Sequence, residues 1–298
     1  AAIALMQSTV KELYAQGTPI YVLYPAVQQL YRQAGYEQAG ILCQWEAKID
    51  RIQMRDRTLS MSEIDLTQPD ILNSVYRQQA ATHNGNLDRH SLIWKAIAHL
   101  PNPQKIDAYS IGSETQPQGY IVFSQSHDGI IQIKDWAVLT PEAGRRFWTF
   151  LADHRSQMET VRWNSAIVDP LSLLLPEQAA KLRWEKRWML RIIHVMTALS
   201  IRGYPTHLEA ELHLEVYDDL LLENNGKFIL SVANGAGEVT RGGSGDLKVD
   251  IRGLAPLYTG LFTAYQLHAI GRIEATEKAL SIAAQVFGGA VPWMPDFF

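Results

Sequence analysis

The opening segment of the chain combines helical and strand-like hydrophobic patterns. Apolar side chains recur at helical spacing over residues 4–16, and Gly17 stands where a left-handed residue would end that helix. Residues 19–24 are apolar throughout, which is typical of a strand in the interior of a sheet. A short helix and a second strand are predicted over residues 26–34 and 41–49. This order is typical of the closing half of an α/β or α+β domain, so we expect its opening half to precede Ala1.

The middle of the chain has a similar cycle of elements. Thr140 suits the N-cap of a helix, Pro141 its first position, and Glu142 the positive end of its dipole. We expect that helix to run to about Gln157 and the next strand to be interrupted by Asp169-Pro170. Two further helices and two strands are predicted before it, over residues 70–79, 90–99, 119–124 and 129–138. The order of elements matches that of the opening segment and indicates a weak internal repeat.

The last third of the chain begins with the pattern of a half-buried strand. Residues 208–216 alternate strictly, with leucine, alanine and valine on one face and glutamate and histidine on the other. Two more strands and two helices are predicted, over residues 228–232, 247–251, 254–268 and 274–287. A sheet followed by packed helices is an α+β arrangement, and we assign the chain to the α+β class.

Composition excludes several classes of protein. The 298 residues are 47% hydrophobic, enough for two or three domains with their own cores. The net charge of -4 provides no basic field for nucleic acid or an anionic membrane. The single cysteine, Cys43, forms no intrachain disulfide, which favours a reducing compartment and hence the cytoplasm. No apolar run approaches the roughly 20 residues of a membrane span.

Three separated segments carry a resemblance to a known family: Leu23–Tyr36, Met189–Tyr204 and Val291–Phe298. Together they resemble the Eis (enhanced intracellular survival) family of GNAT-superfamily N-acetyltransferases. The resemblance implies tandem GNAT domains, the first incomplete at its N-terminus, followed by a sterol carrier protein-like α+β domain. The implied boundaries are 1–49 for the closing half of the catalytic GNAT domain, 50–182 for a second, degenerate GNAT domain and 183–298 for the sterol carrier protein-like domain.

Tyr31 is the candidate general acid. A phenol with a pKa near 10 remains protonated at neutral pH and can protonate a departing thiolate. Periodicity alone favours a different reading, in which Tyr31 lies on the core face of a short helix with Val27 and Leu30. The resemblance favours catalysis, because the family's catalytic tyrosine precedes the tyrosine of a Gly-Tyr pair by five residues, as Tyr31 precedes Tyr36.

Phe298 is the candidate base, because the resemblance implies that the C-terminal carboxylate accepts the proton of the amine. A carboxylate with a pKa near 3.5 is a weak base, so burial or a water relay must assist it. The alternative is a frayed chain end, as most termini are. Phe297 stands where the family often has an acidic residue. Asp296 is the candidate replacement that attracts a cationic amine, so Asp296 and Phe297 are the predicted substrate-binding residues.

The resemblance also implies where acetyl-CoA, the co-substrate, would bind. GNAT enzymes hold its pyrophosphate with a glycine-containing loop that opens onto a helix N-terminus. No such loop lies within this chain, but the first helix begins where that loop would already have passed. The predicted coenzyme contacts are therefore Ala1, Ala2, Tyr24, Pro25 and Arg32, although a solvated surface position suits Arg32 equally well.

The equivalent junction in the middle of the chain argues against a second coenzyme site. There, Glu142 would occupy the position of the phosphate, and a carboxylate repels that group. Residues of roughly 50–180 are therefore interpreted as a degenerate copy that serves as a scaffold. In the same way, Arg191 is expected to form a structural ion pair rather than to contact substrate.

The implied activity is acetyl-CoA-dependent N-acetylation of primary amines on bulky cationic molecules, such as aminoglycoside-like or lysine-like substrates. No metal site is expected, since the nine histidines show no H-E-x-x-H motif and one cysteine cannot form C-x-x-C. Neither nucleic acid nor a membrane is an expected partner. A homo-oligomer, a hexamer by the resemblance, is expected. The rival function is non-enzymatic, with the C-terminal domain as a carrier of an apolar ligand.

Overall fold

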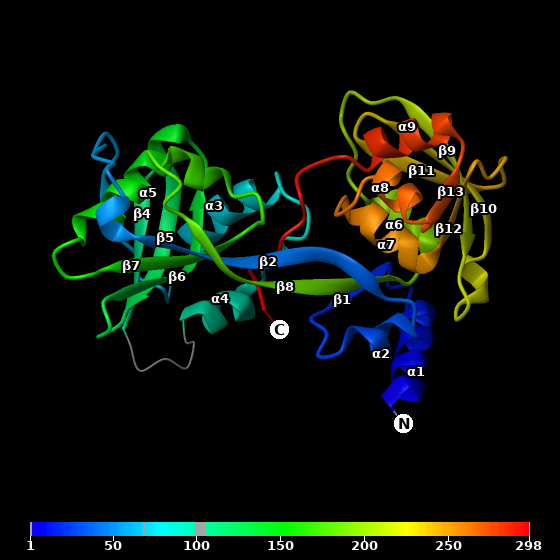
Figure 1. The fold of residues 1–298 in the computed structure, drawn as a ribbon, viewed down its shortest axis with the longest axis horizontal. Coiled ribbons are helices and arrows are strands. Elements are labelled where there is room, and N and C mark those ends of the chain that lie inside the picture. Colours follow the sequence, from blue (N-terminus) through cyan, green and yellow to red (C-terminus); the bar gives the residue numbers. More distant parts are fainter. Residues whose placement is uncertain (1, 68, 99–104, 298) are drawn as a thin grey trace. The chain divides into compact units, whose positions relative to one another are not determined.

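The computed structural model describes residues 2–67, 69–98 and 105–297 (Figure 1). Two compact units divide the chain. Unit 1 comprises Ala1–Gly40 and Arg187–Pro292, and unit 2 comprises Ile41–Lys186 and Trp293–Phe297. The chain passes between the units inside two long strands, β2 (Glu37–Lys48) and β8 (Lys181–Ile192), and again before Trp293. Both units combine helices with sheet, so the α+β class is confirmed.

The N-terminal part of unit 1 follows the predicted order of elements. Helix α1 (Ala2–Ala15), strand β1 (Ile20–Leu23) and helix α2 (Gln28–Arg32) precede β2. Gly17 has a φ of 74°, the left-handed conformation predicted for the end of α1. Its N–H donates to the carbonyl of Tyr14 (2.9 Å), which satisfies an end group of the helix.

Strand β1 differs from its prediction. It pairs antiparallel with β8, Leu23 opposite Met189, and lies at the end of the strand order. Tyr21 of this strand is 41% exposed, so the predicted interior position is wrong for the described strands. An apolar run identifies a strand, but it does not determine how many neighbours the strand has.

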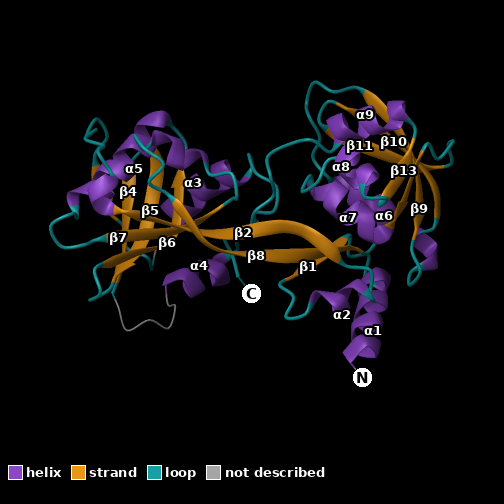
Figure 2. Cartoon of the chain, viewed as in Figure 1, coloured by secondary structure: helices purple, strands orange, loops and turns teal. Residues whose placement is uncertain are grey.

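The C-terminal part of unit 1 contains a five-stranded sheet with the order β11-β10-β9-β12-β13. Helices α6, α7 and α8 lie beside this sheet (Figure 2). Strand β9 buries Leu212, Leu214 and Val216 and leaves its charged side chains outside the core, as its alternation predicts. The elements are α6 (Val195–Ile201), β9 (Ala210–Tyr217), β10 (Gly226–Ala233), β11 (Ala236–Arg241), β12 (Leu247–Asp250), α7 (Ile251–Thr259), α8 (Ala264–Ala269), β13 (Ile273–Ala275) and α9 (Glu277–Val286), with a 3₁₀ turn at Leu222–Asn224.

Two predicted helices of this part differ in the structure: one is divided and the other begins later. Gly260, with a φ of 78°, ends α7, and Thr263 forms a capping box with Gln266 that starts α8. The predicted single helix over residues 254–268 is therefore two. The next predicted helix begins only at Glu277, because Ile273–Ala275 pairs with β12 as strand β13.

Unit 2 is a mixed sheet with helices on both faces. From β2 onward the strand order is β2-β7-β6-β5-β4-β3; β6 and β7 are parallel and the other registered pairs antiparallel. The elements are β3 (Met61–Glu63), α3 (Asp70–Ala80), α4 (Ser91–Ala98), β4 (Ile106–Gly112), β5 (Pro117–Gln125), β6 (Ile130–Val138), α5 (Pro141–Asp153) and β7 (Thr160–Ser165), with 3₁₀ turns at Ile49–Arg51 and Pro170–Leu174. Thr140 caps α5 and Asp169 caps the second 3₁₀ turn, and both positions were predicted as boundaries.

The two faces of this sheet have separate cores. Tyr120 and Val122 of β5 pack with Tyr76 and Trp94 of the α3/α4 layer. Residues that alternate with them along β5 point to the opposite face, where α5 packs against β4, β5 and β6. Figure 1 shows α3 and α5 against the strands of unit 2.

A close packing contact in unit 1 gives a testable prediction. A Cβ at Gly40 would lie 2.0 Å from Cζ2 of Trp188, a rigid and buried ring. Gly40→Ala is therefore expected to destabilise the fold by about 1–3 kcal/mol. Urea denaturation measures this change, and Gly203→Ala is the matched control because a Cβ at Gly203 meets nothing within 4 Å. Equal unfolding midpoints for the two variants would contradict the prediction.

Candidate functional site

Tyr31 lies in the last turn of α2, directly before a sharp reversal of the chain. Gly35, with a φ of 83°, permits this reversal. The carbonyl of Tyr31 accepts hydrogen bonds from the N–H groups of Ala34 (2.9 Å) and Tyr36 (3.2 Å). The side chain is half-buried, and among the described residues its hydroxyl has no hydrogen-bond partner. A phenol held by its backbone with an unengaged hydroxyl is suited to donate a proton to a bound ligand.

Tyr36 and Arg191 form a buried layer next to Tyr31. The Tyr31 and Tyr36 rings meet edge to face with centroids 5.9 Å apart. Tyr36 is fully buried, and burial raises the pKa of its hydroxyl far above the ordinary value, an effect that the Arg191 cation opposes. A Cβ at Gly35 would lie 2.8 Å from Cζ of Arg191, so only glycine allows the reversal to pass this closely over the guanidinium. Tyr31 thus rests on a rigid base.

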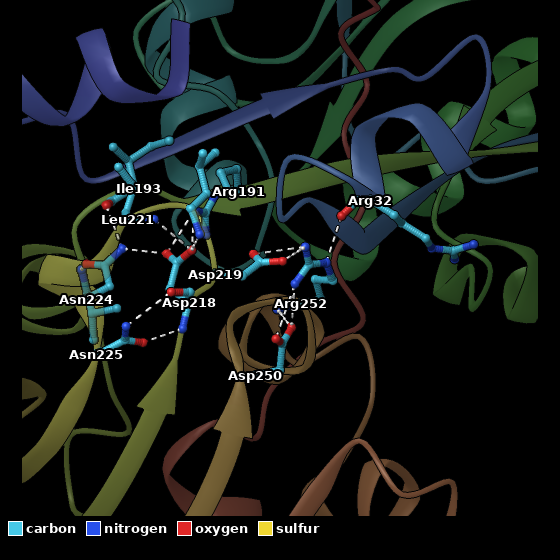
Figure 3. Close-up of polar contacts among 12 residues, drawn as sticks. Arg32, Arg191, Ile193, Asp218, Asp219, Leu221, Asn224, Asn225, Asp250 and Arg252 are labelled. Carbon is cyan, nitrogen blue, oxygen red and sulfur yellow. Dashed lines mark hydrogen bonds and ion pairs between the residues drawn. The ribbon is translucent and has the colours of Figure 1, made fainter. Parts of the chain in front are cut away.

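Arg191 is fixed by a buried ion pair within unit 1 (Figure 3). Its Nη2 donates to both carboxylate oxygens of Asp218 at 2.8 Å, and both side chains are fully buried. Asp218 also accepts from Nδ2 of Asn224 (2.9 Å) and from the N–H groups of Leu220 and Leu221 (3.1 Å each). Burial lowers the pKa of Arg191, and Asp218 opposes this shift. The predicted structural ion pair is confirmed.

This ion pair predicts a strong stability effect. Arg191→Met leaves the Asp218 carboxylate buried with only neutral donors, so we expect the free energy of unfolding to fall by about 3 kcal/mol. Asp218→Asn in the same background removes the buried charge and is expected to restore part of the loss. Urea unfolding of both single variants and the double variant measures the coupling. Additive effects of the two substitutions would mean that the pair is not coupled.

Arg32 adjoins Tyr31 and is held by a carboxylate. Its guanidinium donates to Glu37 from Nε (3.0 and 2.9 Å) and from Nη2 (2.7 Å). The bonds to Glu37 raise the pKa of Arg32. Its carbonyl accepts from Nε of Arg252 (2.7 Å), which in turn is paired with Asp219 and Asp250 (Figure 3). The Arg32 side chain remains 40% exposed, so a ligand can reach it only in competition with Glu37.

Three of the other predicted coenzyme contacts, Ala2, Tyr24 and Pro25, lie among the residues that the structure describes. Tyr24 and Pro25 are half-buried between β1 and α2, and Ala2 begins α1 and is exposed. Together with Tyr31 and Arg32 they belong to unit 1. Ala1 and Phe298 lie outside the described residues.

The predicted substrate-binding residues belong to unit 2. Asp296 was expected to attract a cationic substrate, but in the structure its carboxylate is 9% exposed and paired with Arg89 (Nε to Oδ1, 3.0 Å). Phe297 is 62% exposed, and its ring lies 4.3 Å from Nζ of Lys186. Sequence reasoning did not single out Arg89, and no local pattern indicated its role.

The junction of β6 and α5 in unit 2 has its helix N-terminus occupied by the chain's own side chains. Oγ1 of Thr140 accepts from the N–H of Ala143 (3.2 Å). Glu142 pairs with Arg145 at 2.7 Å, and its pKa is lowered by its own backbone N–H and then by Arg145. The carboxylate predicted to exclude phosphate is thus at the start of the helix.

Pockets elsewhere in the described residues include one of about 580 Å³ in unit 2, with Ile64, Leu66 and Asp107 among its lining residues. No group of three or more His, Cys, Asp or Glu side chains in the described ranges is arranged to hold a metal ion, and no helix there is long and apolar enough to cross a membrane. A pocket of about 140 Å³ in unit 1 is lined by both charged and apolar side chains, among them Arg32, Arg252, Phe262 and Leu267. Its volume is below the roughly 300–1,000 Å³ typical of small-molecule sites.

Comparisons with known proteins match both parts of this architecture. Residues 85–192 match an acetyltransferase (GNAT) domain, and residues 195–295 match a sterol carrier protein domain. An N-acetyltransferase of Streptomyces griseus, whose activity is described only by that class, is 37% identical over 172 residues, or 56% of this chain. The match covers 40% of the Streptomyces protein, so it spans less than half of the length of that relative.

Solved structures extend the similarity to the whole chain. The GCN5-related N-acetyltransferase of Anabaena variabilis is 53% identical with a TM-score of 0.96, and the match covers 100% of this chain and 78% of that one. Eis1 of Mycobacterium abscessus shares the fold, with a TM-score of 0.80 at 23% identity, over 99% of this chain and 77% of that one. The chain therefore belongs to the GCN5-related N-acetyltransferases, a family of acyltransferase enzymes that use acetyl-CoA as co-substrate, and it carries a sterol carrier protein domain.

Proposed function

We propose that this protein transfers the acetyl group of acetyl-CoA to primary amines of bulky cationic molecules, aminoglycoside-like or lysine-like, as the Eis family does. The observation that carries the proposal is the placement of Tyr31. Its backbone is anchored at a glycine-dependent reversal, its ring packs on buried Tyr36, and its hydroxyl is unengaged among the described residues. Membership of the acetyltransferase family supports the reaction class. The substrate class rests on the resemblance of the sequence to the Eis family.

The proposed reaction is a direct transfer. The neutral amine attacks the thioester carbonyl carbon, a C–N bond forms, and the C–S bond breaks as its electron pair moves to sulfur. The Tyr31 hydroxyl gives its proton to the departing thiolate of coenzyme A. The carboxylate of Phe298 accepts the proton that the amine loses, directly or through water. The products are the acetylated amine and the free thiol.

Acetyl-CoA would contact Ala1, Ala2, Tyr24, Pro25 and Arg32 in this proposal. The first turn of α1 offers N–H groups and the positive end of the helix dipole to the pyrophosphate. Arg32 supplies a positive charge beside it, and it must share that charge with Glu37. When bound, acetyl-CoA supplies the activated acetyl group, and the residues of this chain orient it and move the protons.

The second GNAT domain is proposed as a scaffold without a coenzyme site. The occupied N-terminus of α5, with Thr140 and Glu142 bound to the chain itself, supports this role. The proposed boundaries are 1–49 for the catalytic GNAT domain, 50–182 for the second GNAT domain and 183–298 for the sterol carrier protein-like domain. We also propose a cytoplasmic homo-oligomer, a hexamer by the resemblance.

The rival function is a non-enzymatic carrier of an apolar ligand through the C-terminal domain. Its match to a sterol carrier protein domain favours this rival, whereas the small volume and partly charged lining of the unit 1 pocket weigh against it. Thiol release from acetyl-CoA, followed with a disulfide dye, separates the two functions. We expect release only when a polyamine or an aminoglycoside is present. Absence of thiol release with every cationic amine would sink the proposal.

A further inference from the structure

The residues before Phe298 are docked into unit 2 as an ordered segment, which we call the tail (Trp293–Phe297). Trp293 and Met294 are 3% and 2% exposed. The N–H of Trp293 donates to the carbonyl of Asn84 (3.1 Å), and the Trp293 ring stacks on Trp136 with centroids 6.3 Å apart. Trp293 also forms a parallel bridge with Ile41 at the start of unit 2. A tail held this firmly is unlike the frayed end of most chains.

An ion cluster holds the far end of the tail. Arg89 is 1% exposed and pairs with two carboxylates. Its Nη1 and Nη2 donate to Asp135 at 2.6 and 3.1 Å, and its Nε donates to both oxygens of Asp296 at 3.0 and 3.1 Å. Tyr120 completes the cluster with a hydrogen bond from its hydroxyl to Asp135 (2.7 Å). We call Arg89, Asp135 and Asp296 the clamp.

Asp135 and Arg89 meet on one face of the sheet of unit 2. The β5/β6 register shifts between Val122 and Phe123, so that Asp135 lies opposite Val122 while Ile133 lies opposite Phe123. This bulge turns Ile133 to the opposite face of the sheet, whereas Asp135 shares the α3/α4 face with Ala137, two residues along β6. The Arg89 guanidinium lies there over the Tyr76 ring, 3.9 Å from its centroid.

The charges of the clamp indicate that Asp296 serves the tail rather than the core. Arg89 and Asp135 alone would make a balanced, bidentate buried pair. Asp296 adds a second carboxylate to the same cation, and burial raises its pKa, so its ionised form costs free energy that Arg89 only partly offsets. The Arg89–Asp135 pair is balanced without Asp296. The bond from Arg89 to Asp296 therefore serves to anchor the tail.

We propose that Arg89 and Asp296 are positioning residues: they anchor the tail on unit 2, and loss of this anchor lowers the rate of acetyl transfer. This inference rests on the proposed role of the Phe298 carboxylate. Asp296 then acts through the tail and not by contact with the substrate amine. The anchoring itself can be measured without any activity.

Asp296→Ala is the informative substitution. It releases the tail from the clamp but leaves the Arg89–Asp135 pair intact, so unit 2 keeps its core. Replacing Arg89 instead would leave two buried carboxylates unpaired and risk unfolding. Asp296→Asn is the conservative variant because it retains a neutral acceptor. Asp153→Ala is the matched control, since it breaks an exposed ion pair of unit 2 with Arg57.

Hydrogen exchange followed by mass spectrometry tests the anchor in the full-length protein. The peptide that contains Trp293 is expected to exchange about 30-fold faster or more in Asp296→Ala, and to a smaller extent in Asp296→Asn. Peptides from β4 and β5 should be unchanged, and Asp153→Ala should match the wild type. Protection of Trp293 that is equal in all four proteins would overturn the inference.

Steady-state kinetics test the positioning role. We expect kcat to fall in the same order as tail protection, with the KM for acetyl-CoA unchanged and the unfolding temperature lowered by only a few degrees. If Asp296→Ala loses protection at Trp293 but keeps the wild-type kcat, Asp296 anchors the tail but has no positioning role in catalysis. A higher KM for the amine with the tail still protected would instead make Asp296 a substrate contact, and the inference would be wrong. If the wild type transfers no acetyl group, the proposed function is wrong. The hydrogen-exchange result still shows whether Asp296 anchors the tail.

Discussion

Tyr31→Phe is expected to lower kcat by about 10²–10⁴-fold, because the substitution removes a proton donor that is used only in the transition state. The KM for acetyl-CoA should change little, since the ring and its edge-to-face contact with Tyr36 remain. The effect should persist across the pH range in which the wild type is active. Initial rates with saturating amine at several acetyl-CoA concentrations measure both constants.

Tyr36→Phe is the matched control for this prediction. It makes the same chemical change five positions away, at a buried hydroxyl that has no hydrogen-bond partner among the described residues. Its loss relieves an unsatisfied polar group, so we expect wild-type kcat and equal or higher stability. If Tyr31→Phe kept wild-type kcat, Tyr31 would be a core residue, as its helical spacing alone suggests.

Extension of the chain by one glycine after Phe298 is expected to reduce turnover by at least about 10²-fold. The extension converts the proposed base into an amide and moves the negative charge by about 3.5 Å along an extended chain. The unfolding temperature should not change, because the contacts of Trp293 and Asp296 lie upstream of the added residue. Turnover on a polyamine and thermal unfolding are measured on the same preparation.

Phe298→Leu is the control for the extension, because it changes the side chain but retains a carboxylate at the same position. We expect this variant to lose far less activity than the extended protein. Equal turnover of the extended and the native protein would show that the proton leaves through another group or through water.

Local sequence signals predicted the elements whose boundaries are set by single residues. Thr140 and Pro141 start α5, Gly17 ends α1, and the alternation of β9 matches its burial. Gly260 and Thr263 carried equally clear signals, which the longer apolar pattern of the predicted helix over residues 254–268 obscured.

Strands without a buried face were missed. The first half of β8 is largely exposed, including Leu182, and β3 and β11 are short strands at the ends of their sheets. Such strands are defined by backbone pairing with a partner rather than by a hydrophobic pattern. The register shift beside Asp135 could not be predicted either, since a bulge depends on the neighbouring strand.

The candidate site was predictable only where its residues are contiguous. Residues 24–32 form a single loop and helix, so a local motif could nominate Tyr31 as a candidate through the family resemblance. The Arg89–Asp296 pair joins positions 207 residues apart, and nothing in either local sequence indicates the other. The buried Arg191–Asp218 pair spans 27 residues; the sequence predicted that Arg191 would be paired but did not identify its partner.

The most direct test of the proposed function is the stoichiometry of the reaction. The full-length protein is incubated with acetyl-CoA and a polyamine or an aminoglycoside, and both products are quantified by mass spectrometry. We expect one acetylated amine for each coenzyme A released, and neither product when the amine is left out. Release of coenzyme A without an acetylated amine, or no release at all with any cationic amine, would contradict an N-acetyltransferase function.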